Sequence, residues 1–375
     1  MRLLRLLGPA TIVSVAYIDP GNFGANIEAG RSYGLDLLWV VLLSGLLAII
    51  IQYVSGAVGV VRGVGLFDLL SRHKRWFTPV TVAIVLATDM AEFMGVIIGL
   101  HLLFGLPLEI AAAVGFIDVF ILAMLADRRE LFAKLIGTMV VMVAFSFLIE
   151  LYLIGPSWHE VLTSVFTPTL SADMALVAAA IVGATIMPHA VLLHSHIAVG
   201  QKRGDHMYQT VANLLGVAFI NAAILIASAY VLHGREVDIL DIPQVLEPLY
   251  GPLSALLFSL ALLLSGLSSS AVSVEVGVLA ARYIFGKNVQ PWRARLMARA
   301  VNIAPAVLAV GAMGISPIAV LVYTQAALAL TLPVVLGALW YFSRGVVNRG
   351  LSGVVAISAV YTAALVVMVG LGPHA

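Results

Sequence analysis

Residues 16–22 read AYIDPGN, and this stretch decides how the first part of the chain folds. It lies inside an apolar run that is otherwise long enough to cross a membrane. An aspartate, a proline, a glycine and an asparagine follow one another here, and each is costly in a continuous membrane helix. The backbone carbonyl groups that the proline frees need protein, water or an ion as a partner. The sequence therefore predicts a first membrane helix that is broken around residues 19–21.

The composition is that of a helical membrane protein. Of the 375 residues, 62% are hydrophobic and only 10% are charged, and the mean hydropathy is +1.08. Soluble domains carry about 25% charged residues. The apolar runs are too long for the roughly ten-residue alternating strands of a membrane β-barrel. Because the chain has no cysteine, disulfides, iron–sulfur clusters and thiolate metal sites are excluded.

Breaks in the apolar pattern predict about eleven membrane spans. They lie near residues 7–30, 36–60, 78–104, 107–126, 131–154, 172–200, 209–232, 252–284, 295–313, 316–341 and 350–372. The connections between them are too short for a soluble domain, so residues 1–375 are expected to form one transmembrane domain.

Lysine and arginine residues predict the orientation of these spans, because they gather on the cytoplasmic side of a membrane protein. With the N-terminus in the cytoplasm, 18 of the 20 fall on the inner side, and only Arg31 and Arg235 fall outside. Losing or adding one span would destroy this alternation. The sequence therefore predicts a cytoplasmic N-terminus and an external C-terminus.

A second break is predicted in the sixth span, at Met187–Pro188–His189. It lies five spans after the first break, so the two occupy corresponding positions in two halves of opposite orientation, residues 1–154 and residues 172–341. Residues 350–372 add a helix outside this repeat. Matched breaks are typical of a secondary transporter built from inverted repeats, with its binding site near the middle of the membrane. The alternative is that both prolines merely kink their helices.

The residues at the two breaks are of the types that bind metal ions. Asp19 and Asn22 are three residues apart, and around a break both side-chain oxygens can converge on one point. An ionised aspartate at this depth costs about 3 kcal/mol, so a cation is its simplest partner. The alternative is a protonated Asp19 that hydrogen-bonds to a neighbouring helix. Met187 adds a thioether, which favours a transition metal over magnesium or calcium, although a membrane methionine can also serve packing alone. Together they predict a site for manganese(II) or iron(II).

Histidines follow the second break in the stretch HAVLLHSH, residues 189–196. Histidines within a bilayer often relay protons, because their pKa lies near neutrality. We therefore assign proton handling to His189 and His194, with direct metal ligation as the alternative. Gln325 lies near the middle of its span and could reach the same cavity.

A pair of acids lies in the third span, in the stretch TDMAEFMG. Asp89 and Glu92 are one helical turn apart and repel each other if both are ionised, which is typical of a proton relay. The alternative is a static ion pair with an arginine near the inner end of the ninth span: Arg293, Arg295 or Arg299. Gly95 and Gly99 form a G-x-x-x-G step on the same helix, which predicts close helix packing.

Three stretches, AYIDPGN, TDMAEFMG and GATIMPHAVLLHS, together resemble the Nramp family of proton-coupled divalent-metal transporters. The resemblance implies an all-α, LeuT-like fold, with two inverted five-helix repeats, an eleventh helix, and helices one and six broken at the midplane. It implies these metal ligands: Asp19, Asn22, Met187, the carbonyl groups of Ala184 and Ala16, and Gln325. It implies a proton pathway of Asp89, Glu92, His189, His194, Arg293 and Arg295. Two departures leave that metal site intact: Val278 stands where the family tends to have a glutamine, and Ala294 separates two arginines that are usually adjacent.

The resulting hypothesis is a multi-pass symporter of the plasma (inner) membrane that imports Mn²⁺ or Fe²⁺ with protons by alternating access. It is not expected to be an enzyme or to hold a cofactor, and its partners are the transported ions and membrane lipid, with no nucleic acid and no obligate protein partner. An amino-acid or amine carrier of the same fold is one alternative, but it would not need Asp19 beside a thioether. An intramembrane metalloenzyme using His189, His194 and His196 would lack a glutamate at catalytic spacing. A metal channel would differ from a carrier in its flux against a driving force.

Overall fold

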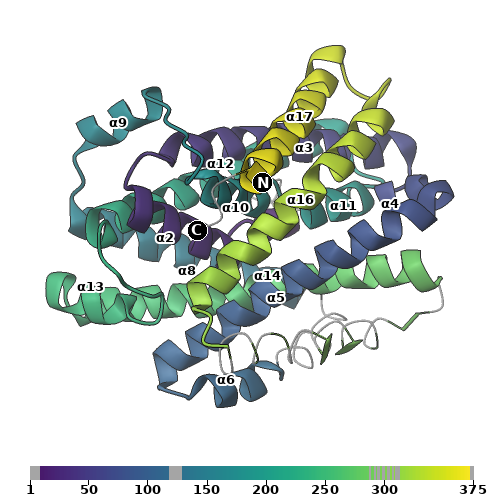
Figure 1. Cartoon of the computed structure of the whole chain (residues 1–375). Coiled ribbons are helices and arrows are strands. Elements are labelled where there is room, and N and C mark those ends of the chain that lie inside the picture. The colour runs from purple at the N-terminus through teal and green to yellow at the C-terminus, as the bar shows by residue number, and fades with distance from the viewer. Residues whose placement is uncertain are drawn as a thin grey trace.

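The computed structural model describes residues 9–117, 129–286 and 313–371, and residues 289, 290, 293, 296, 297, 300, 301, 305 and 308 between them. The regular elements of these residues are helices (Figure 1). They are α1 (Pro9–Ala16), α2 (Pro20–Tyr33), α3 (Leu38–Arg62), α4 (Leu66–Leu69), α5 (Lys74–Phe104), α6 (Leu108–Gly115), α8 (Arg129–Ile154), α9 (Trp158–Phe166), α10 (Ala175–Ile186), α11 (Pro188–Ile197), α12 (Arg203–Leu232), α13 (Ile242–Tyr250), α14 (Pro252–Phe285), α16 (Pro317–Ser343) and α17 (Arg349–Leu371).

Within the described residues, seven helical stretches are long and apolar enough to cross a membrane, or eight if the bent pair 141–154 and 158–166 is one span. Most of the predicted spans coincide with helices, and the first corresponds to α1 and α2 together. The span predicted at 295–313 lies mainly outside the described residues, and that at 107–126 is described only to residue 117. The prediction of a helical membrane protein is confirmed, while the division into inverted repeats stays a prediction.

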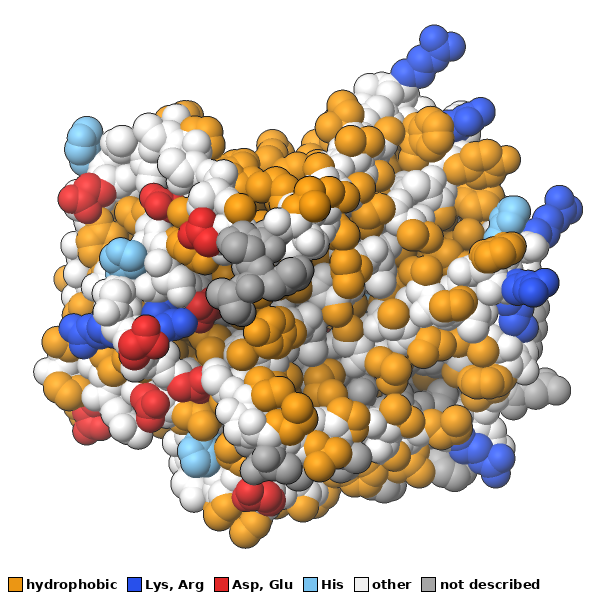
Figure 2. Space-filling model, in the orientation of Figure 1, with side chains coloured by type: hydrophobic (Ala, Val, Ile, Leu, Met, Phe, Trp, Pro, Cys, Tyr) orange, Lys and Arg blue, Asp and Glu red, His pale blue; other side chains and the backbone are white. Residues whose placement is uncertain are grey.

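Charged side chains gather at the two ends of the molecule, and hydrophobic side chains cover much of the surface between them (Figure 2). Acidic side chains lie at the end that carries α9 and α13, and most basic side chains of the visible face lie at the opposite end, near α4. This distribution suits a protein whose middle faces lipid and whose ends face water.

The chain is interrupted at both predicted breaks. α1 ends at Ala16 and α2 begins at Pro20, and α10 ends at Ile186 while α11 begins at Pro188. Each proline occupies the first turn of its helix, where its missing N–H is no loss. Each also follows an alanine by four residues, Ala16 and Ala184, whose carbonyl groups therefore lack the usual helical donor. The same local chemistry opens both helices.

Small residues let the broken helices approach their neighbours closely. α2 and α10 both contact α16, α10 also contacts α3, and α5 runs along α14. A Cβ atom on Gly95 of α5 would overlap with the ring of Pro20, and one on Gly99 would lie 2.6 Å from Leu263 of α14. The close packing predicted for these two glycines is confirmed. A Cβ on Gly183 of α10 would overlap with the backbone carbonyl of Gln325. The absence of a side chain at Gly183 therefore lets α16 pack directly against α10, next to the second break.

Candidate metal centre

Asp19 caps the N-terminus of α2 with its own side chain. Its Oδ1 accepts a hydrogen bond from the Asn22 backbone N–H at 3.0 Å, and its Oδ2 accepts one from the Gly21 N–H at 3.2 Å. The backbone of Asp19 is extended, with φ −112° and ψ 160°, as is usual for a residue before a proline. Its side chain is 3% exposed, so the helix N-terminus and these N–H groups replace water around the carboxylate. The break therefore fixes one carboxylate at a known orientation.

Asn22 joins the two breaks. Its Nδ2 donates to Asp19 Oδ1 at 2.6 Å, to the Tyr17 carbonyl at 3.2 Å and to the Ala184 carbonyl at 2.9 Å, while its Oδ1 accepts from the Thr185 hydroxyl at 3.3 Å. Three oxygen acceptors from both broken helices thus converge on one amide nitrogen. The same oxygen atoms can hold a cation in place of the amide nitrogen. This requires the Asn22 side-chain amide to rotate by about 180°, so that its oxygen faces the cation.

Met187 occupies the second break itself. It is the one non-glycine residue with a positive φ, 51°, in the part of the chain that the structure describes, and its side chain is fully buried. A non-glycine residue in this conformation is strained, and such residues cluster at binding sites. In the sequence, Met187 follows Ala184 by three residues. Ala16, at the corresponding place in the first break, is the last residue of α1 and is buried.

Gln325 reaches the first break from α16. Its side chain is 1% exposed, and neither its Oε1 nor its Nε2 has a hydrogen-bond partner. A Cβ atom on Gly21 would overlap with the Gln325 amide, so this amide lies against the backbone between Asp19 and Asn22. A buried amide without a partner is rare because it forfeits its hydration, and a ligand at the site would supply what is missing.

The histidines of α11 point to two different neighbours. The Nδ1 of His189 lies 3.1 Å from the Thr88 hydroxyl of α5, and the Nδ1 of His194 lies 2.9 Å from Gln52 Oε1 of α3. The Nε2 atoms of both rings lack a partner, and His196 is exposed. Among the described residues no three His, Asp or Glu side chains form a group that could hold a metal ion. A zinc centre built from these three histidines is therefore not supported.

Asp89 and Glu92 are buried on α5, at 6% and 1% exposure. The hydroxyl of Ser269 on α14 donates to Glu92 Oε2, and Thr88, which precedes Asp89, contacts His189. The acid pair therefore lies next to α14 and, through Thr88, next to the second broken helix. Arg293 is exposed, and Arg295 lies outside the described residues.

Two buried titratable residues escaped the prediction. His206 of α12 packs edge-on against His194, with ring centroids 4.9 Å apart, and its Nε2 lies 3.0 Å from the Tyr53 carbonyl. Its sequence context, KRGDHMYQ, is that of an exposed helix end and gives no signal of burial. Glu150 of α8 is 4% exposed, and its position inside the apolar stretch FSFLIELYLI was a usable signal.

The chain is similar to known proteins over most of its length. The family model described as Nramp, "Natural resistance-associated macrophage protein-like", matches residues 10–372. The chain is 36% identical over 353 residues to "Divalent metal cation transporter MntH" of Caldanaerobacter subterraneus, which covers 88% of this chain and 83% of that protein. It is 35% identical over 366 residues to the protein of the same name from Deinococcus radiodurans, with 91% and 82% covered.

Solved structures of other proteins share the fold. A manganese transporter of Eremococcus coleocola superposes with a TM-score of 0.84 at 24% identity, covering 99% of this chain and 87% of that one. Mhp1, a nucleobase-cation-symport-1 family transporter, superposes with a TM-score of 0.66 at 15% identity, covering 98% of this chain and 90% of that one. The predicted LeuT-like fold class is thereby confirmed.

Proposed function

The chain belongs to the Nramp family, and from this premise we propose that it carries divalent transition metals, Mn²⁺ and Fe²⁺, across the plasma membrane together with protons. The family consists of transporters, not enzymes. The observation that supports the proposal best is the convergence of Asp19 Oδ1 and the Ala184 carbonyl on the Asn22 amide, where two broken helices meet.

The proposed ligands suit a transition metal. A carboxylate, an amide oxygen and a backbone carbonyl alone would suit Mg²⁺ or Ca²⁺, which prefer oxygen ligands. The thioether of Met187 is a soft ligand that these two ions do not favour, so it biases the site towards Mn²⁺ and Fe²⁺. The Gln325 amide, unpartnered and adjacent to Gly21, would complete the set.

The burial of the proposed site supports alternating access. Asp19, Asn22, Met187 and Gln325 are all at most 3% exposed, so an ion reaches them only if helices move. A cavity of about 370 Å³ lies between α1, α8 and α12 and extends to Ile18, the neighbour of Asp19. Because α1 is the half of the first span nearest the predicted cytoplasmic N-terminus, we assign this cavity to the inner route.

The proton route is proposed to leave the metal site along α11 and α5. His189 follows Met187 by two residues, and Thr88 connects its ring to the helix that carries Asp89 and Glu92. Protons that move with the metal would bind to these side chains while the site is open to the outside and would leave them on the inner side, with the N-terminus of the chain in the cytoplasm.

Asp19→Asn tests the role of the carboxylate cleanly. Asparagine is as good an N-cap as aspartate, so the variant keeps the cap of α2 while removing the charge. We expect Mn²⁺ binding, measured by calorimetry, to be lost in Asp19→Asn with little change in thermal stability. Asp19→Ala, as the matched control, should lose both binding and about 1 kcal/mol of cap stability. Retained Mn²⁺ affinity in Asp19→Asn would reduce Asp19 to a structural cap.

Met187→Ala tests the choice of metal. Radioactive metal uptake and proton uptake are measured in proteoliposomes for the parent protein and for the variant. We expect Mn²⁺ uptake to persist at reduced affinity and Ca²⁺ to become a competing substrate, because only oxygen ligands remain. If discrimination against Ca²⁺ and Mg²⁺ is unchanged, the thioether does not select the metal.

A further inference from the structure

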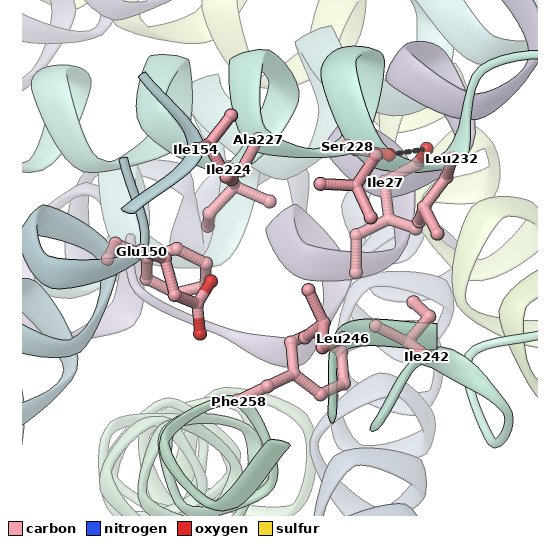
Figure 3. A pocket seen from close by; sticks show the side chains of 12 residues that line it. Ile27, Glu150, Ile154, Ile224, Ala227, Ser228, Leu232, Ile242, Leu246 and Phe258 are labelled. Carbon is pink, nitrogen blue, oxygen red and sulfur yellow. Dashed lines mark hydrogen bonds between the residues drawn. The ribbon is translucent and has the colours of Figure 1, made fainter. Parts of the chain in front are cut away.

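A small apolar cavity lies beneath α13, away from the proposed metal site. It has a volume of about 30 Å³ and is lined by residues of α2, α8, α12, α13 and α14 (Figure 3). Its lining includes Ile27, Ile224, Ile242, Leu246 and Phe258, and the carboxyl group of Glu150 lies among these side chains. Space of this size holds about one water molecule.

Glu150 has no partner in this cavity. Its Oε1 makes no hydrogen bond, and no ion pair of Glu150 occurs among the described residues. The other polar side chain of the lining, Ser228, donates its hydroxyl hydrogen to the Ile27 carbonyl at 2.8 Å. None of the lining residues from α2, α12, α13 and α14 is titratable or charged. An ionised carboxylate here would cost several kcal/mol, so the closed cavity requires the neutral acid.

The helix that closes the cavity is short and amphipathic. Ile242 and Leu246 of α13 are 3% and 4% exposed and face the cavity, whereas Glu247 on the same helix is exposed. α13 ends at Tyr250, and Gly251 after it, with a φ of 85°, reverses the chain into α14. The contacts of α13 with the cavity are therefore apolar, and they are compatible with lifting of α13 as a unit once the cavity admits water. By the lysine and arginine pattern, this end of the molecule faces outside.

We propose that Glu150 is a proton-binding site that controls closure of α13 over the outer half of the protein. With the cavity open and wet, Glu150 is a carboxylate; it takes one proton from external hydronium, giving a carboxylic acid and water, and the neutral side chain allows α13 to close. Loss of the proton to external water reopens the cavity. This inference rests on the proposed function in one respect, the role of the proton in transport: a proton taken up outside would accompany closure of the protein around the metal.

The absence of cysteine makes the test direct, because Ala227→Cys introduces the only thiol of the chain into the cavity lining. The labelling rate of this thiol by a small, membrane-impermeant methanethiosulfonate is measured from mildly acidic to mildly alkaline pH in reconstituted full-length protein. The same thiol in a Glu150→Gln background corrects for ionisation of the thiol itself. We expect the ratio of the two rates to rise about tenfold with pH, which corresponds to a coupling of about 1.4 kcal/mol.

Further variants separate titration from simple disturbance of packing. Glu150→Asp keeps an ionisable group and should keep the increase of the labelling rate with pH. Glu247→Gln removes an exposed acid of α13 instead, and it should also keep this increase. Glu150→Met is a second neutral variant, suited to an apolar cavity, and should behave as Glu150→Gln does. If the thiol labels with the same pH dependence in any folded neutral variant as in the parent, Glu150 does not control closure.

Mn²⁺ uptake by the same preparations distinguishes this inference from the proposed function. A parent protein that shows the Glu150-dependent labelling but takes up no Mn²⁺ would overturn the proposed function and leave the proton site standing. Normal Mn²⁺ uptake combined with identical labelling in the presence and absence of the Glu150→Gln substitution would overturn the proton site alone.

Discussion

At the residue scale, the two breaks share one pattern and differ in the residue that precedes the proline and in the residue that follows the alanine. Residues 16–20 read AYIDP and residues 184–188 read ATIMP, with alanine, isoleucine and proline at the same places. In each, the proline deprives the alanine carbonyl of its helical donor. The residue before the proline is Asp19 in one break and Met187 in the other. Under the proposed function, the two breaks would present a hard ligand and a soft ligand from equivalent positions, and that combination favours a transition metal over calcium.

Gln325→Leu should weaken Mn²⁺ binding several-fold without lowering stability. The Gln325 amide has no hydrogen bond to lose, and leucine has a similar volume, so removal of a buried unpartnered amide is neutral or stabilising. Gln52→Leu is the matched control, because it leaves His194 Nδ1 without its partner at a cost of about 1–3 kcal/mol. Calorimetry with Mn²⁺ and thermal unfolding measure the two effects. Unchanged affinity in Gln325→Leu would show that this amide does not bind the metal.

At the element scale, the glycines of α5 set the distance between α5 and the first break. Gly95→Ala should destabilise the fold by about 1–3 kcal/mol, because the added methyl group would overlap with Pro20 and push α5 from α2. Mn²⁺ affinity should fall with it, since Pro20 adjoins Asp19. Gly337→Ala on α16 is the control: its Cβ would meet nothing within 4 Å, and alanine favours a helix by up to about 1 kcal/mol. Equal thermal stability of the two variants would contradict this packing.

The elements differ in how far the sequence predicts them. The breaks of α1/α2 and α10/α11 were predictable because proline acts on its own backbone, whatever packs around it. Matched positions in two halves predict that the two breaks face one cavity, whereas the Ala184 carbonyl near Asn22, 162 residues away, is predicted only by the family resemblance. His206 was not predictable, since a Cβ on Gly56 of α3 would overlap with its ring and the space for it arises only when α3 and α12 pack. Glu150 was visible as an acid in an apolar run, but its cavity depends on five helices.

At the scale of the whole molecule, charge is distributed unevenly between the two ends (Figure 2). The connections predicted to lie outside, together with the adjoining outer ends of the predicted spans, carry nine acids and only two arginines, Arg31 and Arg235. The acids are Glu28, Asp36, Glu109, Glu160, Asp173, Glu236, Asp238, Asp241 and Glu247. Arg31 is engaged by Glu28 at 2.8 Å and by Glu236 at 3.8 Å, so its charge is locally compensated. The end predicted to lie outside thus presents a negative field to approaching ions, and such fields raise the local concentration of cations.

The consequence is a dependence of metal uptake on salt. Screening shortens from about 10 Å at 0.1 M to about 3 Å at 1 M ionic strength, so an inert monovalent salt should raise the KM for Mn²⁺ about tenfold and leave kcat unchanged. Asp36 and Glu160 line a polar cavity of about 420 Å³ at this end, and Asp36→Asn with Glu160→Gln should raise KM at low salt and flatten its salt dependence. Asp68→Asn removes an acid at the predicted inner end; it is the control and should change neither the KM at low salt nor its salt dependence. Initial uptake rates in proteoliposomes measure both constants, and a KM that is independent of salt would mean that the outer acids do not attract the metal.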